Sequence, residues 1–202
     1  PVAIIEHPDV RRMILRMRAL TEGARALLYY TAGQVDRATL GIEGAQMRAD
    51  VLVPLIKAWG TDIGCEVASI GVQIHGGMGF VEETGAAQYY RDAKILTIYE
   101  GTTAIQANDL VGRKTARDGG RTAKAIAAQI ETTEAELTQR DSADAHAVAK
   151  RLKAAREAFV EVVEFVAGQT KATPNAVFAG SVPYLMLAGN LVAGWQLARS
   201  LL

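Results

Sequence analysis

The sequence contains few of the residues that break helices or build covalent frameworks. Its 202 residues include one cysteine and five prolines. One cysteine excludes an internal disulfide framework and favours a reducing compartment. No proline lies between Pro54 and Pro174, so a long stretch lacks the strongest helix breaker. A charge surplus is absent too, because 22 basic side chains balance 22 acidic ones. This balance argues against nucleic-acid binding, which normally needs basic excess.

Apolar residues make up 50% of the chain, and alanine and leucine, both good helix formers, are abundant. Segments in which β-branched or aromatic residues alternate with polar ones are nearly absent. The sequence therefore predicts an all-α protein. The first helix is expected from Pro8 to about Ala32, with Gly33 ending it in a left-handed conformation. Residues 34–45 are expected to form a loop or a short helical linker.

A second long helix is expected over residues 46–75. Along it, Gly60, Gly64, Ala68 and Gly71 recur at steps of four, four and three, which places them on one face. Each interior glycine costs about 1 kcal/mol relative to alanine, so something must compensate for several of them. A row of small residues lets another helix backbone approach closely. We therefore expect a tight helix–helix contact here, either inside the subunit or between subunits.

The middle of the chain predicts short elements. A helix is expected over residues 86–93, and residues 94–99 are the only stretch with the composition of an extended segment. Thr103 and Gln106 have the spacing of a capping box. This spacing predicts that a new helix begins near Thr103 and ends near Arg117.

The sequence Asp-Gly-Gly at 118–120 is the best candidate domain boundary, which predicts one helical domain over residues 1–117 and a second helical region over residues 121–202. Beyond the boundary, two apolar stripes have the narrow spacing of helical-bundle seams. They consist of Ala123, Ile126, Ile130 and Leu137, and of Val148, Leu152, Ala155, Phe159, Val162 and Val166. Residues 184–202 are apolar enough to resemble a membrane span, but Asn190, Gln196 and Arg199 favour a buried helix.

Two features are candidates for chemistry. Glu100 lies in a turn before a helix start, where a carboxylate can act as a base or simply interact with the helix dipole. The glycine run that follows His75 either lets a cofactor approach the backbone or ends a helix. The three histidines have no ligand-like spacing, so no metal site is expected. Cys65 is expected to be a packed residue and not a nucleophile.

Three segments in this order closely resemble the acyl-CoA dehydrogenase family. They are residues 73–80 (QIHGGMGF), 90–95 (YRDAKI) and 98–102 (IYEGT). The resemblance covers residues 1–117 and corresponds to the C-terminal four-helix-bundle domain of the family. The last 80 or so residues resemble an extra helical region of a longer branch, which includes the 3-methylmercaptopropionyl-CoA dehydrogenases.

The resemblance implies α,β-dehydrogenation of an acyl-CoA thioester, with hydride transfer to FAD. By position, Glu100 matches the glutamate that removes the α proton, and its backbone N–H matches a donor to the thioester carbonyl. The other matching residues are Gln73, Gly76 and Gly77 for the ADP half of FAD on a neighbouring subunit, Thr102 for the flavin, and Tyr99 and Gly101 for the thioester end of the substrate. The chain departs from the family pattern at Ala104, where glutamine is common, and at Ala107, where many relatives have arginine.

The resemblance also implies an N-terminal helical domain and a middle β-domain, which this sequence does not contain. The chain is therefore expected to be a fragment that folds but is inactive and lacks FAD on its own. The implied partners are an acyl-CoA substrate, electron-transfer flavoprotein and identical subunits in a homodimer or homotetramer, with no nucleic acid and no membrane span. The implied location is the bacterial cytoplasm or, alternatively, the mitochondrial matrix. Two alternatives remain: a non-catalytic helical oligomerisation module, or a fragment of an acyl-CoA oxidase.

Overall fold

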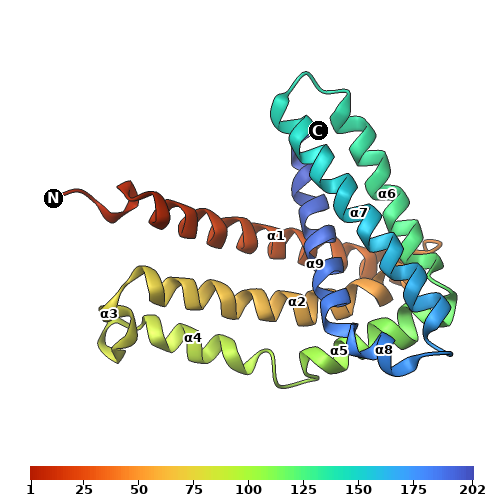
Figure 1. The fold of residues 1–202 in the computed structure, drawn as a ribbon, viewed down its shortest axis with the longest axis horizontal. Coiled ribbons are helices and arrows are strands. Elements are labelled where there is room, and N and C mark those ends of the chain that lie inside the picture. Colours follow the sequence, from red (N-terminus) through yellow and green to blue (C-terminus); the bar gives the residue numbers. More distant parts are fainter.

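The computed structural model describes residues 1–202 and contains helices and turns without any strand, so the all-α prediction is confirmed (Figure 1). The α-helices are α1 (Pro8–Thr39), α2 (Ala45–Ile74), α3 (Gly77–Phe80), α4 (Ala86–Ile95), α5 (Thr103–Asp109), α6 (Arg121–Thr138), α7 (Ala143–Gln169), α8 (Pro174–Ala179) and α9 (Ser181–Ala198). The remaining helices are the 3₁₀ turns η1 (Ile4–Glu6), η2 (Glu82–Thr84), η4 (Ala116–Asp118) and η5 (Arg199–Leu201), and the π-helix η3 (Leu110–Thr115).

The helices form two groups that meet at α9. Helices α1, α2 and α4 lie side by side, whereas α6 and α7 form a hairpin at a steep angle to them (Figure 1). Helix α9 contacts α1, α2, α5 and α7, and therefore belongs to both groups. One cluster of 30 buried apolar residues extends from Leu27 on α1 to Ala198 on α9. The apolar core thus continues across the Asp118–Gly120 segment.

The two groups pack closely at Trp59 on α2, which lies against α9. Its side chain is 2% exposed, and its indole N–H donates a hydrogen bond of 2.9 Å to Oδ1 of Asn190. A Cβ atom on Gly189 would lie only 2.3 Å from Cγ of Trp59. Only glycine at this position lets the backbone of α9 lie against the indole ring.

The stripe of small residues on α2 is not covered by a helix backbone of this chain. A Cβ atom on Gly64 would meet nothing within 4 Å, one on Gly60 would meet only Ile56 of the same helix, and one on Gly71 would meet only the end of Met17 at 3.8 Å. The expectation of a tight contact inside the subunit is therefore wrong for these glycines. A contact between subunits at this stripe stays a prediction.

Two local expectations are wrong because tertiary contacts override them. Helix α1 continues through Gly33 to Thr39, because the next residue, Gln34, is buried and accepts a hydrogen bond from Arg48 on α2. Residues 96–99 form helical turns and not an extended segment. No strand lies beside them, and the Leu96 carbonyl accepts a hydrogen bond from Lys57 instead.

Helix α5 begins at Thr103, as predicted, but its cap lies one residue before the threonine of the capping box. Thr102 is the N-cap, and its hydroxyl accepts a hydrogen bond of 3.4 Å from the N–H of Ile105. The hydroxyl of Thr103 donates to Asp62 on α2. Thr103 therefore anchors the start of α5 to α2 and does not cap the helix.

Helix α9 is buried between its neighbours, as expected from its few polar residues. Its interior positions include Tyr184, which is 3% exposed and hydrogen-bonds to the buried Thr115 hydroxyl over 3.0 Å. No helix in the chain combines the length and the apolar character that a membrane span requires.

Replacing Gly189 by alanine should destabilise the fold, because the indole of Trp59 occupies the position of the new methyl group. We expect a loss of about 1–3 kcal/mol in the free energy of unfolding, the usual cost of overpacking. Gly194→Ala on the same helix is the control, since its methyl group meets nothing within 4 Å. It should gain about 0.5–1 kcal/mol from helix propensity. Urea unfolding measures both, and equal effects would contradict the packing argument.

Because the phenol of Tyr184 is buried, the free energy of unfolding should depend on pH in alkaline solution. Burial raises the pKa of Tyr184 to about 12, whereas an unfolded tyrosine has a pKa of about 10. The unfolded chain therefore loses this proton first, and stability should fall by about 1.4 kcal/mol per pH unit between these values. Urea unfolding between pH 8 and 11 should show a smaller fall in Tyr184→Phe. Parallel curves for the two proteins would refute the assignment.

Candidate functional site

Glu100 lies in the turn between α4 and α5 and has an unusual backbone conformation. Its φ of 54° makes it the only non-glycine residue with a positive φ. Such a conformation costs about 1–2 kcal/mol for a residue with a Cβ atom, so the surrounding structure must impose it. The next residue, Gly101, has a φ of 97°, and a Cβ atom there would lie 2.8 Å from the side-chain nitrogen of Gln106. The turn therefore requires glycine at position 101.

Helix α2 forms hydrogen bonds with residues that precede and follow Glu100 in the sequence. Before Glu100, the ammonium group of Lys57 donates a hydrogen bond of 2.7 Å to the Leu96 carbonyl. The same ammonium lies 5.6 Å from the ring centroid of Tyr99. After Glu100, the hydroxyl of Thr103 donates to Asp62 over 3.2 Å. Sequence reasoning missed Lys57 and Asp62, because nothing in the local pattern of α2 indicates that they contact a turn some 40 residues further along the chain.

The groups of this turn are available to another molecule. Tyr99, Glu100 and Thr102 are exposed, and Gly101 is half-buried. The backbone N–H groups of Glu100, Gly101 and Thr102 donate no hydrogen bond within the chain. The turn thus presents a carboxylate next to several free N–H donors, the combination that binds and activates a carbonyl compound.

The glycine run forms a second exposed segment, at the end of α2. Gly76 has a φ of 61°, and neither it nor Gly77 would bring a Cβ atom within 4 Å of another atom. The backbone there is open to close approach. Gln73 is exposed, and its side chain makes no hydrogen bond with the chain. Gly79 serves packing instead, since a Cβ atom there would lie 2.1 Å from the Val72 carbonyl oxygen.

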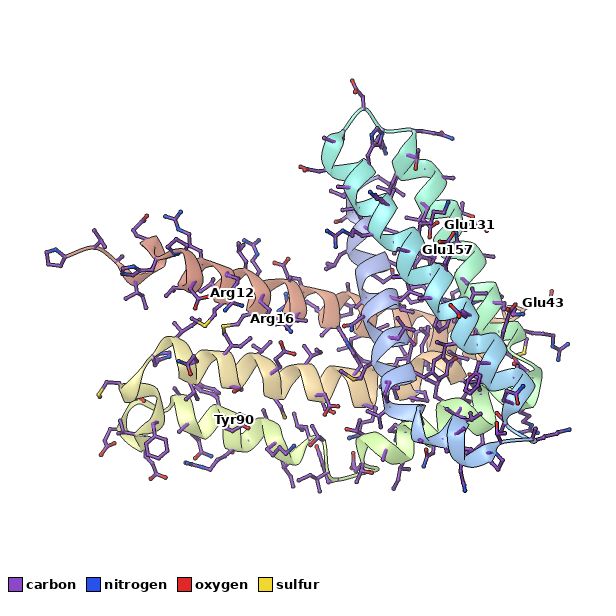
Figure 2. All side chains as sticks on the ribbon, in the orientation of Figure 1. Arg12, Arg16, Glu43, Tyr90, Glu131 and Glu157 are labelled. Carbon is purple, nitrogen blue, oxygen red and sulfur yellow. The ribbon has the colours of Figure 1, made fainter.

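The structure does not bring these two segments together within one chain. The glycine run precedes α4 and the Glu100 turn follows it, so the length of α4 separates them (Figure 1). Ten helical residues span about 15 Å. Several large apolar side chains between residues 78 and 105 are exposed, and Tyr90 lies among the side chains of α4 (Figure 2). They are Met78, Phe80, Tyr89, Tyr90, Ile95, Ile98, Tyr99 and Ile105.

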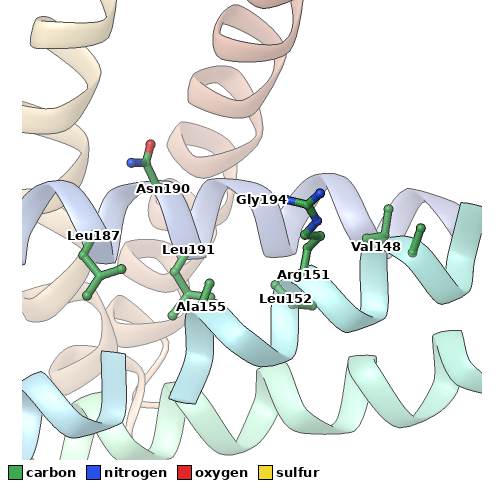
Figure 3. A pocket seen from close by; sticks show the side chains of 9 residues that line it. Val148, Arg151, Leu152, Ala155, Leu187, Asn190, Leu191 and Gly194 are labelled. Atoms are coloured by element: carbon green, nitrogen blue, oxygen red, sulfur yellow. The ribbon is translucent and has the colours of Figure 1, made fainter. Parts of the chain in front are cut away.

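Two other features offer no catalytic groups. Cys65 is half-buried on α2, its thiol donates to the Ala93 carbonyl over 3.3 Å, and burial raises its pKa. It is a packed residue, as expected. A groove of about 380 Å³ lies between α7 and α9 (Figure 3). Its walls are mainly apolar, and Arg151 is its only charged side chain.

Two protein-family models match the chain. The model described as "Acyl-CoA dehydrogenase, C-terminal domain" matches residues 2–114. The model described as "Acetyl-CoA dehydrogenase C-terminal like" matches residues 123–202. The first match contains both segments described above and covers more than half of the chain.

Curated relatives match over the whole chain. It is 58% identical to 3-methylmercaptopropionyl-CoA dehydrogenase of Ruegeria pomeroyi, over 100% of this chain and 35% of that protein. It is 34% identical to the broad-specificity linear acyl-CoA dehydrogenase FadE5 of Mycobacterium tuberculosis, over 98% of this chain and 34% of that protein. The chain therefore spans about a third of the length of these relatives.

Solved structures show the same fold. Caenorhabditis elegans ACDH-11 in complex with C11-CoA superposes with a TM-score of 0.74 at 17% identity, over 95% of this chain and 32% of that chain. The sequence motifs, the two family models and the relatives agree. The chain belongs to the acyl-CoA dehydrogenase family and comprises its C-terminal helical domain together with an additional C-terminal helical region.

Proposed function

We propose that this chain supplies the catalytic base of an FAD-dependent acyl-CoA dehydrogenase, and that the base is Glu100. The conformation of Glu100 carries the proposal. A carboxylate is held in a left-handed turn, at an energetic cost, by two contacts from α2. A glutamate that only interacts with a helix dipole needs no such conformation.

The turn contains the groups needed to remove a proton next to a thioester. The carboxylate of Glu100 takes the α proton, while the free N–H of the same residue donates to the carbonyl oxygen. This donation stabilises the negative charge that develops on the oxygen as the proton leaves. Tyr99 and Gly101 border the same position, and the absence of a side chain at Gly101 leaves room for the thioester.

The exposed residues also fit a flavin nucleotide. When bound, FAD would accept the hydride from the β carbon of the substrate. Gln73 offers an unpartnered amide, and Gly76 and Gly77 offer open backbone to its ADP half. Thr102 uses its hydroxyl oxygen as an acceptor for the helix cap, so its O–H stays free to donate to the flavin. The distance along α4 supports the assignment of Gln73, Gly76 and Gly77 to the flavin of a neighbouring subunit.

The proposed partners follow from the same assignment. The substrate is an acyl-CoA, and electron-transfer flavoprotein is the proposed electron acceptor. The half-buried glycines of α2, which no helix backbone of this chain approaches, and the exposed apolar side chains of α3 to α5 support a homodimer or homotetramer. The bacterial origin of the relatives supports a cytoplasmic location.

The base assignment can be tested in a chimera. This chain would replace the matching segment of the Ruegeria pomeroyi relative, to which it is 58% identical. Glu100→Gln keeps the shape of the side chain but removes the base, so the rate of flavin reduction by 3-methylmercaptopropionyl-CoA should fall by about 10²–10⁴-fold. Stopped-flow absorbance of the flavin measures this rate.

Glu136→Gln is the matched control, because Glu136 is an exposed glutamate of α6 that forms no ion pair. It should leave the rate unchanged. The flavin content of each chimera shows whether the site is assembled. A Glu100→Gln chimera that holds flavin and is reduced at the parent rate would refute the proposal.

The isolated 202-residue chain should hold no stoichiometric flavin and should not oxidise acyl-CoA. The reason is geometric, since its flavin-contacting groups lie at opposite ends of α4 and are exposed to solvent. Absorbance near the flavin maximum after purification, and dye reduction with an acyl-CoA panel, measure this. A yellow, active preparation would show that the chain assembles a complete site.

A further inference from the structure

A pocket of about 330 Å³ lies where the two helix groups meet, on the side of α1 and α2 that faces α6 and α9. It contains three arginines and no carboxylate. Its walls are Tyr30, Gln34 and Arg37 on α1, Arg48 on α2, Gln129 and Thr132 on α6, Trp195 on α9, and Arg199 on η5. None of these residues belongs to the Glu100 turn or to the glycine run.

The three arginines are not neutralised within the chain. Arg37, Arg48 and Arg199 form no ion pair, although most of the other arginines on α1 pair with a carboxylate. The nearest acidic residues in the sequence are Asp36, next to Arg37, which forms no ion pair, and Asp50, two residues from Arg48, which pairs with Lys114 at 3.7 Å. In a chain whose net charge is zero, three unpaired guanidinium groups around one pocket create a local excess of positive charge.

Two of the arginines are held in place by their neighbours. Arg48 donates to Oε1 of the buried Gln34 over 2.9 Å and to the Glu43 carbonyl over 3.3 Å. Glu43 is at the edge of the molecule where α1 and α2 are joined (Figure 2). Arg199 lies 5.7 Å from the ring of Trp195 and donates to Gln196 over 2.9 Å. These contacts restrain both guanidinium groups at the pocket.

The hydroxyl of Tyr30 lies within the field of all three arginines. Its ring packs edge-on against Trp195, with 5.3 Å between ring centroids, and its O–H donates to Gln129 over 3.3 Å. Burial raises the pKa of Tyr30, while Arg48, Arg199 and Arg37 each lower it. The three guanidinium charges thus act on one point inside the pocket, which helices of both groups surround.

A second cluster of basic side chains differs from this pocket, because carboxylates within the chain neutralise part of its charge. Arg113 and Lys114, in the π-helix η3, border a pocket of similar size. Arg113 pairs with Asp109 at 3.1 Å, and Lys114 pairs with Asp50 at 3.7 Å. Some of the N–H donors of Arg113 and Lys114 are therefore already paired with carboxylates of the chain. The pocket at Arg37, Arg48 and Arg199 has no such internal partner.

We propose that the pocket of Arg37, Arg48 and Arg199 binds the diphosphate group of a small molecule. Guanidinium groups donate in pairs to phosphate oxygens, and arginine is the preferred residue for such bidentate contacts. Three of them match the charge of a diphosphate better than that of a single carboxylate. Tyr30, Thr132 and Gln129 supply further polar groups at the pocket wall. This site is independent of the Glu100 chemistry.

Isothermal titration of the 202-residue chain with inorganic pyrophosphate, at low ionic strength and without divalent cations, tests the proposal. Saturable 1:1 binding is expected. Arg37→Gln is the informative variant, because the Arg37 side chain makes no hydrogen bond or ion pair that the fold requires. It should weaken binding at least about tenfold, the effect of losing one charge-assisted contact. Arg140→Gln is the matched control, since Arg140 is exposed, forms no ion pair and lies just beyond the far end of α6.

The outcomes distinguish specific binding in the pocket from nonspecific electrostatic binding of anions. Unchanged binding by Arg140→Gln together with weakened binding by Arg37→Gln supports the site. Equal weakening by both variants, no saturation, or equal binding of sulfate and pyrophosphate overturns it. ADP in a parallel titration identifies the source of the diphosphate. Tighter binding of ADP than of pyrophosphate indicates a nucleotide, and equal binding indicates that only the diphosphate is recognised.

Discussion

The contact between Trp59 and the backbone of α9 positions the rest of the molecule. Gly189 lets the backbone of α9 lie against the indole ring of the buried Trp59. Asn190 accepts a hydrogen bond from the indole N–H, so the polar atom of this side chain also has a partner. The contact fixes α2 relative to α9. Because α2 also carries Lys57 and Asp62, the same contact determines the position of the helix that holds the Glu100 turn.

Much of the helical architecture could be predicted from the sequence, because periodic apolar residues report the buried face of a helix directly. The stripes from Ala123 to Leu137 and from Val148 to Val166 are largely buried, as expected. The misplaced boundaries are those where a distant partner intervenes. Gly33 does not end α1, since Arg48 stabilises the continuation at Gln34. The small residues of α2 predicted a close contact, but the close contact inside the chain is at Gly189.

The candidate site was predictable in part. The motif around Glu100 identified the residue, and its place between two helices follows from the local pattern. Its left-handed backbone and the two contacts from α2 were not predictable, because they depend on pairs of residues about 40 positions apart. The arginine pocket was even less predictable, because its residues are farther apart in the sequence. Arg37, Arg48 and Arg199 form no motif, and only the packing of α9 on α1 and α2 brings Arg199 to the other two.

The shared core also limits how the protein can be dissected. The glycines at 119 and 120 suggest a convenient place to cut the chain, and the two family models meet near them. A cut that removed α9 would nevertheless take away the helix backbone that lies against Trp59 and expose this side chain on the other piece. Exposed apolar surface of this kind promotes aggregation. A polypeptide that stops at this boundary should therefore be less soluble than the full chain, because the apolar core continues across the point where the two family models meet.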